Sequence, residues 1–439
     1  MSSKEFLLQE CENVKDVLEE TLRFKYGLDG SEEFYHECET RRQIIQSEIR
    51  ATDENNLQRL ASNGRLLSEL SGLVSRIERS SLGEYSWPFV EELKEIAFSI
   101  CKEDTASGKD TPPKVYVLSG GGLSSYRIYP ERQRSFVSKK RILTIVFPRT
   151  LKHYVLFHPI LGHEIGHAMW RCSKHQHELR KIVSEELINT GGRFASADET
   201  ADWIYSQNPP TEMEVILKSL EQRGFKQDNI FARYANWDAW KEEILCDLVG
   251  LVIFGPSFVA AHAELLYAIS PSGITLGQLH PPPGCRVNMI IRAAKIMKYD
   301  DISTMDDCEC RRATEKYWEE YEAKIKPDPW FDIFSDDQLR KAIERISALV
   351  EKYPPTLFEF TSGELLKSLY NKLSNCVPPV GFDFKSDDDT SCYPLDFRHI
   401  LYAGWVFSKS DSNISFSDIN QLCEHAIMQQ RGIDRYLAS

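Results

Sequence analysis

The sequence predicts an α+β protein that is mainly helical, with a small antiparallel or mixed sheet and flanking helical regions. Apolar residues recur at helical spacing over residues 1–104, and short β-rich runs lie between 114 and 148. Helical patterns return from about residue 157. With 439 residues, the chain has material for two or three domains. We expect three regions: helical 1–110, central 111–300 and helical 301–439.

Composition and charge indicate an ordinary globular protein and narrow its partners. The chain is 42% hydrophobic and 27% charged, with a net charge of −13. Because phosphate contacts need Lys and Arg, this balance disfavours nucleic acid and anionic membranes as partners. We find no apolar run of about 18 residues that would predict a membrane span, and the acidic opening stretch is unlike a signal peptide. The eleven cysteines form no Cys-x-x-Cys pair, so we expect reduced thiols and a cytoplasmic location.

The N-terminal region carries two apolar stripes at helical spacing. Each stripe places its apolar side chains on one helical face. Because the second stripe is too short for a long coiled coil, we expect a helical bundle that packs on the rest of the chain. A partner-binding or dimerising arm is the alternative. The stripes consist of Leu7, Cys11, Val14, Leu18 and Leu22, then Leu60, Leu67, Leu70, Val74 and Ile77.

Three short runs predict the strands of the sheet. The first two are "KVYVL" and "SYRIY", with a turn over Ser119 to Ser125 between them. The Gly120-Gly121-Gly122 run lacks the Lys-Ser/Thr ending of a phosphate-binding loop, which favours the turn. The third run is "ILTIVFP", from Ile142 to Pro148. A sheet is therefore expected just ahead of the helical patterns that follow.

The stretch "HPILGHEIGHAMW" contains the pattern His163-Glu164-Ile165-Gly166-His167. Residues four apart share one helical face, so both imidazoles can bind one zinc ion. Glu164, one residue after the first histidine, is placed to reach a water at that ion. The uncharged flanking residues suit a buried helix. Isolated matches to this pattern occur by chance, so the rest of the site must be sought elsewhere.

A third ligand is offered by "NWDAWKEEILCDLVGLVIFG". Glu243 and Asp247 are four apart on a predicted helix, so one carboxylate can bind zinc while the other orients a histidine through its second N–H. Glu242 is expected to point off that face. Glu178 and Glu199 are weaker alternatives. The ordinary interpretation, a solvated helix edge, explains poorly why two acids interrupt an apolar face.

A third motif, from His280 to Arg286 in "QLHPPPGCRVNMI", completes a resemblance to a known family. His-Glu-x-x-His, then Glu-x-x-x-Asp, then His-Pro-Pro-x-x-x-Arg look like the gluzincin zinc metallopeptidases. The chain most resembles soluble relatives of the HtpX and CAAX prenyl proteases. The matching part covers about 140–290. The membrane proteases of this branch carry transmembrane helices, which the sequence does not predict here.

The resemblance implies a zincin-like core in the central region and a role for each matched residue. Glu164 would be the general base, and His280 would contact the substrate carbonyl. Asp247 would orient a ligand, and Arg286 would have an orienting or structural role. The implied zinc ligands are His163, His167 and Glu243.

We therefore expect a zinc-dependent endopeptidase that acts on a protein or peptide. A regulatory protein could bind the N- or C-terminal helices, which gives one alternative: a toxin or defence effector held inactive until a partner binds. A non-catalytic interaction protein on a zincin scaffold is the other alternative. Such proteases add the substrate as an extra strand at a sheet edge. The strand Ile142 to Pro148 is either that edge or an ordinary buried strand.

Overall fold

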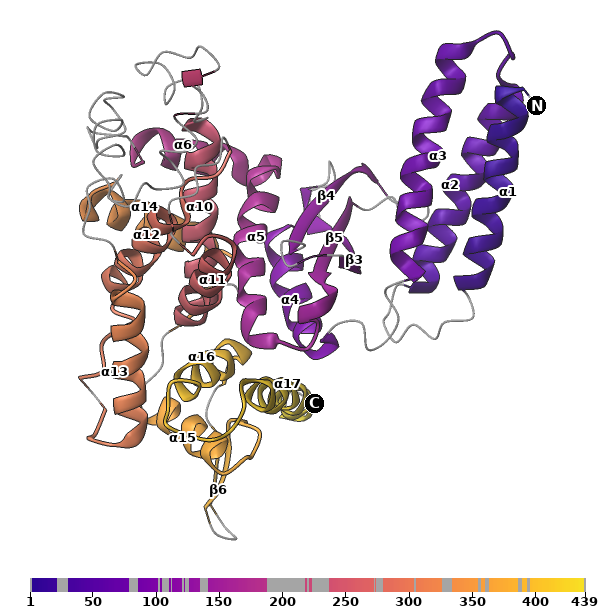
Figure 1. Ribbon diagram of the computed structural model, residues 1–439. Helices are drawn as coiled ribbons and strands as arrows, with labels where there is room; N and C mark the ends of the chain where they lie inside the picture. Colours follow the sequence, from indigo (N-terminus) through magenta and orange to yellow (C-terminus); the bar gives the residue numbers. More distant parts are fainter. Residues whose placement is uncertain are drawn as a thin grey trace. The chain divides into compact units, whose positions relative to one another are not determined.

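The computed structural model shows a mainly helical protein with a small three-stranded mixed sheet, as the sequence predicts (Figure 1). No helix among the described residues combines the length and apolar character needed to cross a membrane. The structure describes residues 2–21, 31–78, 86–101, 103–104, 110–111, 113–120, 122, 126–134, 141–187, 218, 221–222, 237–271, 273, 279–303, 305–325, 334–353, 357–359, 363–385, 389–392 and 395–437.

The chain forms two compact units. The first unit comprises Met1–Lys94 and Cys101–Lys152, and the second comprises Glu95–Ile100 and His153–Ser439. This division does not coincide with the boundaries expected at residues 110 and 300. The predicted strands belong with the N-terminal helices, and residues beyond 300 belong with the predicted metal helices.

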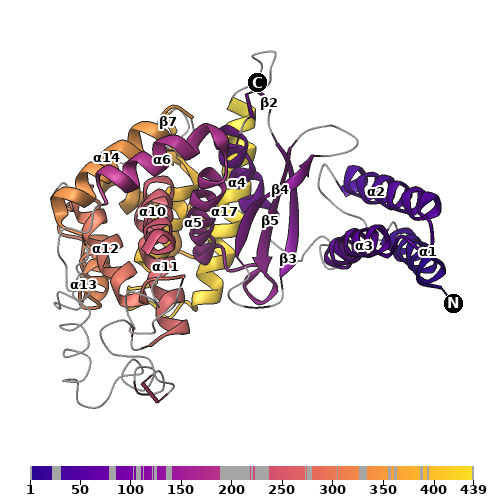
Figure 2. The same ribbon diagram turned by 90° about the horizontal axis from the view of Figure 1, so that it is seen from above.

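Three long helices lie side by side in the first unit: α1 (Ser3–Thr21), α2 (Ser31–Ala51) and α3 (Leu57–Glu78) (Figures 1 and 2). Both predicted stripes supply buried side chains to their common core, including Cys11, Leu18 and Leu67. Lys4 ties α1 to the end of α2, because its Nζ donates to the carbonyl oxygens of Arg50 and Thr52. The expected helical bundle is thus present. Leu22 and the side chain of Ile77 lie outside the described part.

The sheet of the first unit has β5 (Arg141–Pro148) at its centre. It pairs in parallel with β3 (Lys114–Gly120) and antiparallel with β4 (Arg127–Arg134). The predicted strands therefore exist, but the first two do not pair with each other. A two-residue pairing, β1 (Glu103–Asp104) with β2 (Asp110–Thr111), precedes them.

The central position of β5 decides between the two interpretations of Ile142 to Pro148. Both sides of this strand are hydrogen-bonded to neighbours, and its side chains from Ile142 to Pro148 are buried. It is an ordinary buried strand. The alternative interpretation, a substrate-binding edge, is wrong, because the backbone groups of β5 are already used within the sheet.

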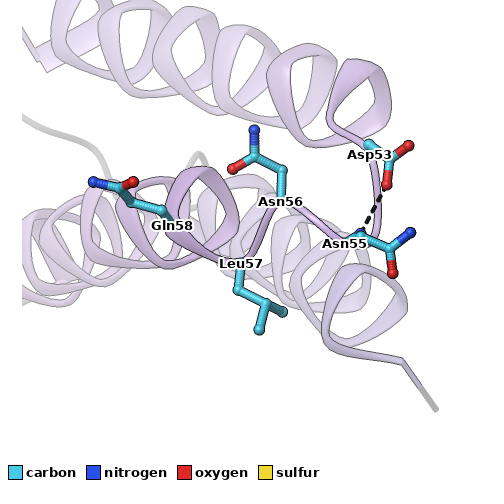
Figure 3. Close-up of a pocket in the computed structure, with 5 residues that line it drawn as sticks. All are labelled: Asp53, Asn55, Asn56, Leu57 and Gln58. Carbon is cyan, nitrogen blue, oxygen red and sulfur yellow. Dashed lines mark hydrogen bonds between the residues drawn. The ribbon is translucent and has the colours of Figure 1, made fainter.

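The turn between α2 and α3 carries an open pocket of about 650 Å³ (Figure 3). Inside the turn, the backbone N–H of Asn55 donates to Asp53 Oδ1 over 2.8 Å. Leu57 beside it is 67% exposed. Neither a histidine nor a cysteine lines this pocket. Its lining residues are Asp53, Asn55, Asn56, Leu57 and Gln58.

Helices dominate the second unit, and α4 (Trp87–Ile100) is divided between the units. The stretch 375–394 contains the paired strands β6 (Phe382–Lys385) and β7 (Asp389–Cys392). The remaining elements, in chain order, are η2 (Arg149–Leu151, in the first unit), η3 (Val155–Ile160), α5 (Leu161–Trp170), α6 (Ser173–Glu185), α10 (Trp237–Phe254), α11 (Pro256–Ile269), α12 (Pro283–Ile296), α13 (Glu309–Glu322), α14 (Asp336–Val350), α15 (Gly363–Ser374), β6 (Phe382–Lys385), β7 (Asp389–Cys392), α16 (Phe397–Phe407) and α17 (Phe416–Leu437).

The C-terminal helices hold the ends of the two predicted metal helices. Just before α5, the Leu156 N–H donates to Asn420 Oδ1 over 3.0 Å, and the Leu156 carbonyl accepts from Trp405 Nε1 over 2.8 Å. At the end of α10, the buried Arg398 donates to the Ile253 carbonyl over 2.6 Å, where a cation also suits the helix dipole. Residues beyond 300 are therefore part of the framework that positions the site.

Candidate metal centre

Two histidines face the site from α5. His163 and His167 lie one helical turn apart, and their rings meet edge to face with centroids 4.7 Å apart. Both side chains are largely buried, because α5 packs along α10 (Figures 1 and 2). The pattern predicted from the sequence therefore does lie on a buried helix.

The carboxylate of Glu243 on α10 meets both histidines. Its Oε1 lies 3.1 Å from His167 Nε2, and its Oε2 lies 3.4 Å from His163 Nε2. The ligand atoms of these three residues lie within 4.8 Å of one another, so the group could hold a metal ion. Two imidazoles and one carboxylate form the donor set of many catalytic zinc sites, which keep a further position open.

The hydrogen bonds around this group fit a metal. Glu243 Oε2 is buried and accepts no hydrogen bond in the described part of the chain. Arg286 Nη1 and His163 Nε2 each lie 3.4 Å from this oxygen. A buried carboxylate oxygen without a donor is costly unless another positive partner satisfies it. A divalent cation between Glu243 and the two histidines would be such a partner.

Asp247 orients the first histidine. Its Oδ1 lies 2.7 Å from His163 Nδ1, so that nitrogen carries the proton and Nε2 keeps its lone pair for a metal. Arg286 on α12 grips the same carboxylate through two bonds: Nε to Oδ2 at 2.7 Å and Nη2 to Oδ1 at 2.6 Å. Burial raises the pKa of Asp247, but the charge and the hydrogen bonds of the Arg286 guanidinium outweigh it and hold the pKa well below its usual range. The carboxylate therefore stays ionised.

Glu242 is a site residue that the sequence reasoning missed. It was expected to point away, yet its Oε1 lies 3.0 Å from His167 Nδ1. Glu242 thus holds the second histidine as Asp247 holds the first, with Nε2 again left for the metal. The signal in the sequence was the pair Glu242-Glu243 itself. Two adjacent acids on one helix can each contact a different ring nitrogen of the same histidine, as Glu242 and Glu243 do with His167.

Removing the Glu242 carboxylate should weaken the site. We expect Glu242→Ala to lower metal affinity or activity about 10- to 100-fold, because His167 loses the partner that fixes its ring. Glu242→Gln, which keeps an acceptor oxygen, should lose less. Affinity can be measured by competition with a chromogenic chelator. Asp238→Ala removes an exposed carboxylate of the same helix and serves as control; an equal loss in both variants would refute the role of Glu242.

The remaining predicted residues take different positions. Glu164 lies on α5, partly exposed, and no hydrogen bond or ion pair engages its carboxylate in the described part of the chain. His280 stands at the rim: its side chain is 61% exposed, and its Nε2 is 3.6 Å from Glu243 Oε1. Glu178 pairs with Arg345 on α14 instead of joining the site. Glu199 lies outside the described residues.

Glycines bring the two metal helices into close contact. A Cβ added at Gly166 would lie 2.7 Å from the Cys246 Cα, and one at Gly162 would lie 2.9 Å from the Gly250 Cα. A Cβ at Gly250 would lie 3.0 Å from the His163 backbone nitrogen. We call Gly162, Gly166 and Gly250 the glycine seam. It sets the spacing at which the carboxylate of α10 reaches the histidines of α5.

Filling the glycine seam should push the helices apart. Gly166→Ala forces a methyl group against backbone that cannot move alone, so we expect a destabilisation of about 1–3 kcal/mol and a loss of metal affinity. Gly72→Ala in α3 is the matched control, because a Cβ there meets no atom within 4 Å. That control should be neutral or stabilising, since alanine favours helix. The free energy of unfolding in denaturant and the metal content are measured for both variants. An unchanged stability and metal content in Gly166→Ala would contradict the role of the glycine seam in setting the helix spacing.

In comparisons with known proteins, no family model, no curated protein and no solved structure matches the chain. Its assignment to a function therefore rests on the geometry of the centre and on the sequence motifs.

Proposed function

We propose that this protein is a zinc-dependent endopeptidase with a zincin-like core, related to the gluzincins. One observation carries the proposal: two histidine Nε2 atoms and the Glu243 carboxylate converge while carboxylates hold both Nδ1 atoms. Zinc-binding histidines commonly have such carboxylate partners. The intact His-Glu-x-x-His pattern adds a glutamate that a purely structural zinc site does not need.

Zinc fits the donor set better than magnesium or calcium, which prefer oxygen ligands. His163, His167 and Glu243 would hold the ion, with Asp247, Glu242 and Arg286 behind them. When bound, the ion supplies Lewis-acid chemistry for the attack of water on a peptide carbonyl.

The chain's own residues supply the proton transfers and the orientation. Glu164 accepts a proton from the attacking water and passes it to the leaving amine. His280, exposed at the rim, donates a hydrogen bond to the oxygen that gains negative charge. Arg286 keeps Asp247 ionised, so that His163 stays fixed during turnover.

The decisive experiment combines metal analysis with a search for cleavage. We expect one zinc per chain in purified protein, and loss of that zinc in His163→Ala and His167→Ala. Cells expressing wild type should contain new protein N-termini that are absent from cells expressing Glu164→Gln. Failure to bind zinc after reconstitution would refute the proposal. Zinc without any new N-termini would favour the interaction-protein alternative.

A further inference from the structure

A three-residue segment, Leu357 to Glu359, is held against the last turn of α10. The Phe358 N–H donates to the Val252 carbonyl over 3.1 Å. The Phe358 ring fills the space beside Gly255 (φ 59°), where an added Cβ would lie 2.3 Å from the ring carbon Cδ1. We call residues 357–359 the strap. Because α10 also supplies the carboxylates of the metal centre, the strap contacts a helix on which that centre depends.

Two side chains at the start of α16 hold the strap in place. Arg398 Nη2 donates to the Leu357 carbonyl over 3.2 Å, and His399 Nε2 donates to the Glu359 carbonyl over 2.8 Å. The His399 ring also packs on the Phe358 ring, with 5.1 Å between the centroids. A guanidinium keeps its charge at any physiological pH, whereas an imidazole titrates near neutrality. Of these two contacts, only that of His399 can therefore respond to pH.

The hydrogen bonds of His399 define its tautomer. Its Nδ1 accepts from the Asp396 backbone N–H over 3.2 Å, in the capping box that begins α16. Because the Glu359 carbonyl can only accept, Nε2 carries the single proton of the ring. The neutral ring is thus bonded at both nitrogens. A second proton, on Nδ1, would point at the Asp396 N–H, so the charged ring cannot keep this position.

The surroundings of His399 favour its neutral form. Its side chain is buried, and this burial, together with the Arg398 charge, lowers the pKa of the ring against the opposing effect of Asp396. The Asp396 carboxylate is already engaged, because its Oδ1 accepts from both the backbone N–H and Nε of Arg398 over 2.8 Å, and its Oδ2 accepts from Nη2. In the described part of the chain, the charged groups that face His399 are Asp396, Arg398 and the exposed Glu359.

We propose that His399 is an acid-sensitive latch: its neutral ring holds the strap on the end of α10, and protonation of the ring releases the strap. A histidine in the unfolded chain takes up its proton below about pH 6.5, whereas the buried ring does so only at lower pH. The unfolded state therefore binds more protons in this range. The stability that the latch contributes is present above about pH 6.5 and is lost as the pH falls. The latch needs no bound metal, so it is independent of the proposed function.

The test follows hydrogen exchange at the Phe358 amide, relative to its intrinsic rate, from about pH 8 to about pH 5. In wild type, acid should lower the protection of this amide about fivefold or more, as expected when one net hydrogen bond is lost. The amides inside α14 should keep their protection. His399→Gln keeps a donor for the strap but cannot titrate, so its Phe358 protection should not depend on pH.

His153→Gln is the matched control, because it removes an exposed histidine that pairs with Glu424. This variant should lose Phe358 protection in acid as wild type does. Protection in wild type that is the same at both ends of the pH range would overturn the latch. An equal acid-induced loss in His399→Gln would also overturn it, because another group would then be titrating. If His399→Gln does not fold, the wild-type exchange alone decides, by the loss at Phe358 against the constant protection of α14.

Discussion

Glu164→Gln should lower turnover on the order of 10²- to 10⁴-fold while leaving zinc content and stability unchanged. The amide has nearly the shape of the carboxylate but cannot accept the proton of the attacking water. Because no hydrogen bond or ion pair engages the Glu164 carboxylate in the described part of the chain, its loss should disturb no packing. Once a substrate is identified by its new N-termini, initial rates of its cleavage measure the effect.

Glu178→Gln is the matched control for this change. Glu178 is a half-buried glutamate on the neighbouring helix α6 and pairs only loosely, at 3.6 Å, with Arg345. The same substitution there should leave the cleavage rate near that of wild type. Near wild-type cleavage by Glu164→Gln, with zinc in place, would show that another group takes the proton.

Glu243→Ala should have the second large effect, the loss of the metal itself. It removes a direct ligand, so the fall in zinc affinity should exceed the about 10- to 100-fold expected for loss of an outer partner such as Glu242. The metal-free site would hold Arg286 and two histidines with one carboxylate fewer, so the centre would also repel a cation more strongly. Zinc affinity by chelator competition gives the ranking directly.

Glu243→Gln separates charge from shape in this experiment. It keeps an oxygen of the same reach but removes the negative charge, so affinity should fall between the values of wild type and Glu243→Ala. Circular dichroism should show an intact fold for both variants. If Glu242→Ala weakened zinc binding more than Glu243→Ala, Glu242 would be the ligand and the assignment on α10 would be reversed.

The direct members of the site were predictable because each depends on a short periodic spacing. His163 and His167, four apart, had to share a helical face, and Glu243 with Asp247 had to share another. Glu242 was not predictable in the same way. It acts through the direction from which α5 approaches α10, and that direction is not encoded in the spacing of residues along one helix.

The same distinction holds for the fold. The helical stripes of α1 and α3 and the β-rich runs predicted elements correctly, because local periodicity reports which face is buried. Local periodicity does not report the order of strands in a sheet. The parallel pairing of β3 with β5 depends on how the chain crosses over between them, and this pairing makes β5 the central strand. The role of the C-terminal helices was equally hidden, since Asn420 and Trp405 act on Leu156, more than 200 positions away.

The glycine seam has a consequence for how variation in this protein should be interpreted. In a mutational scan scored by activity, the three glycines of the seam should tolerate almost no substitution, because neighbouring atoms already occupy the space that a Cβ would need. On such a map they would be as intolerant as His163, although they perform no chemistry. Temperature separates the two classes: a seam variant that folds in the cold should regain some metal and some cleavage, whereas a ligand variant should regain neither.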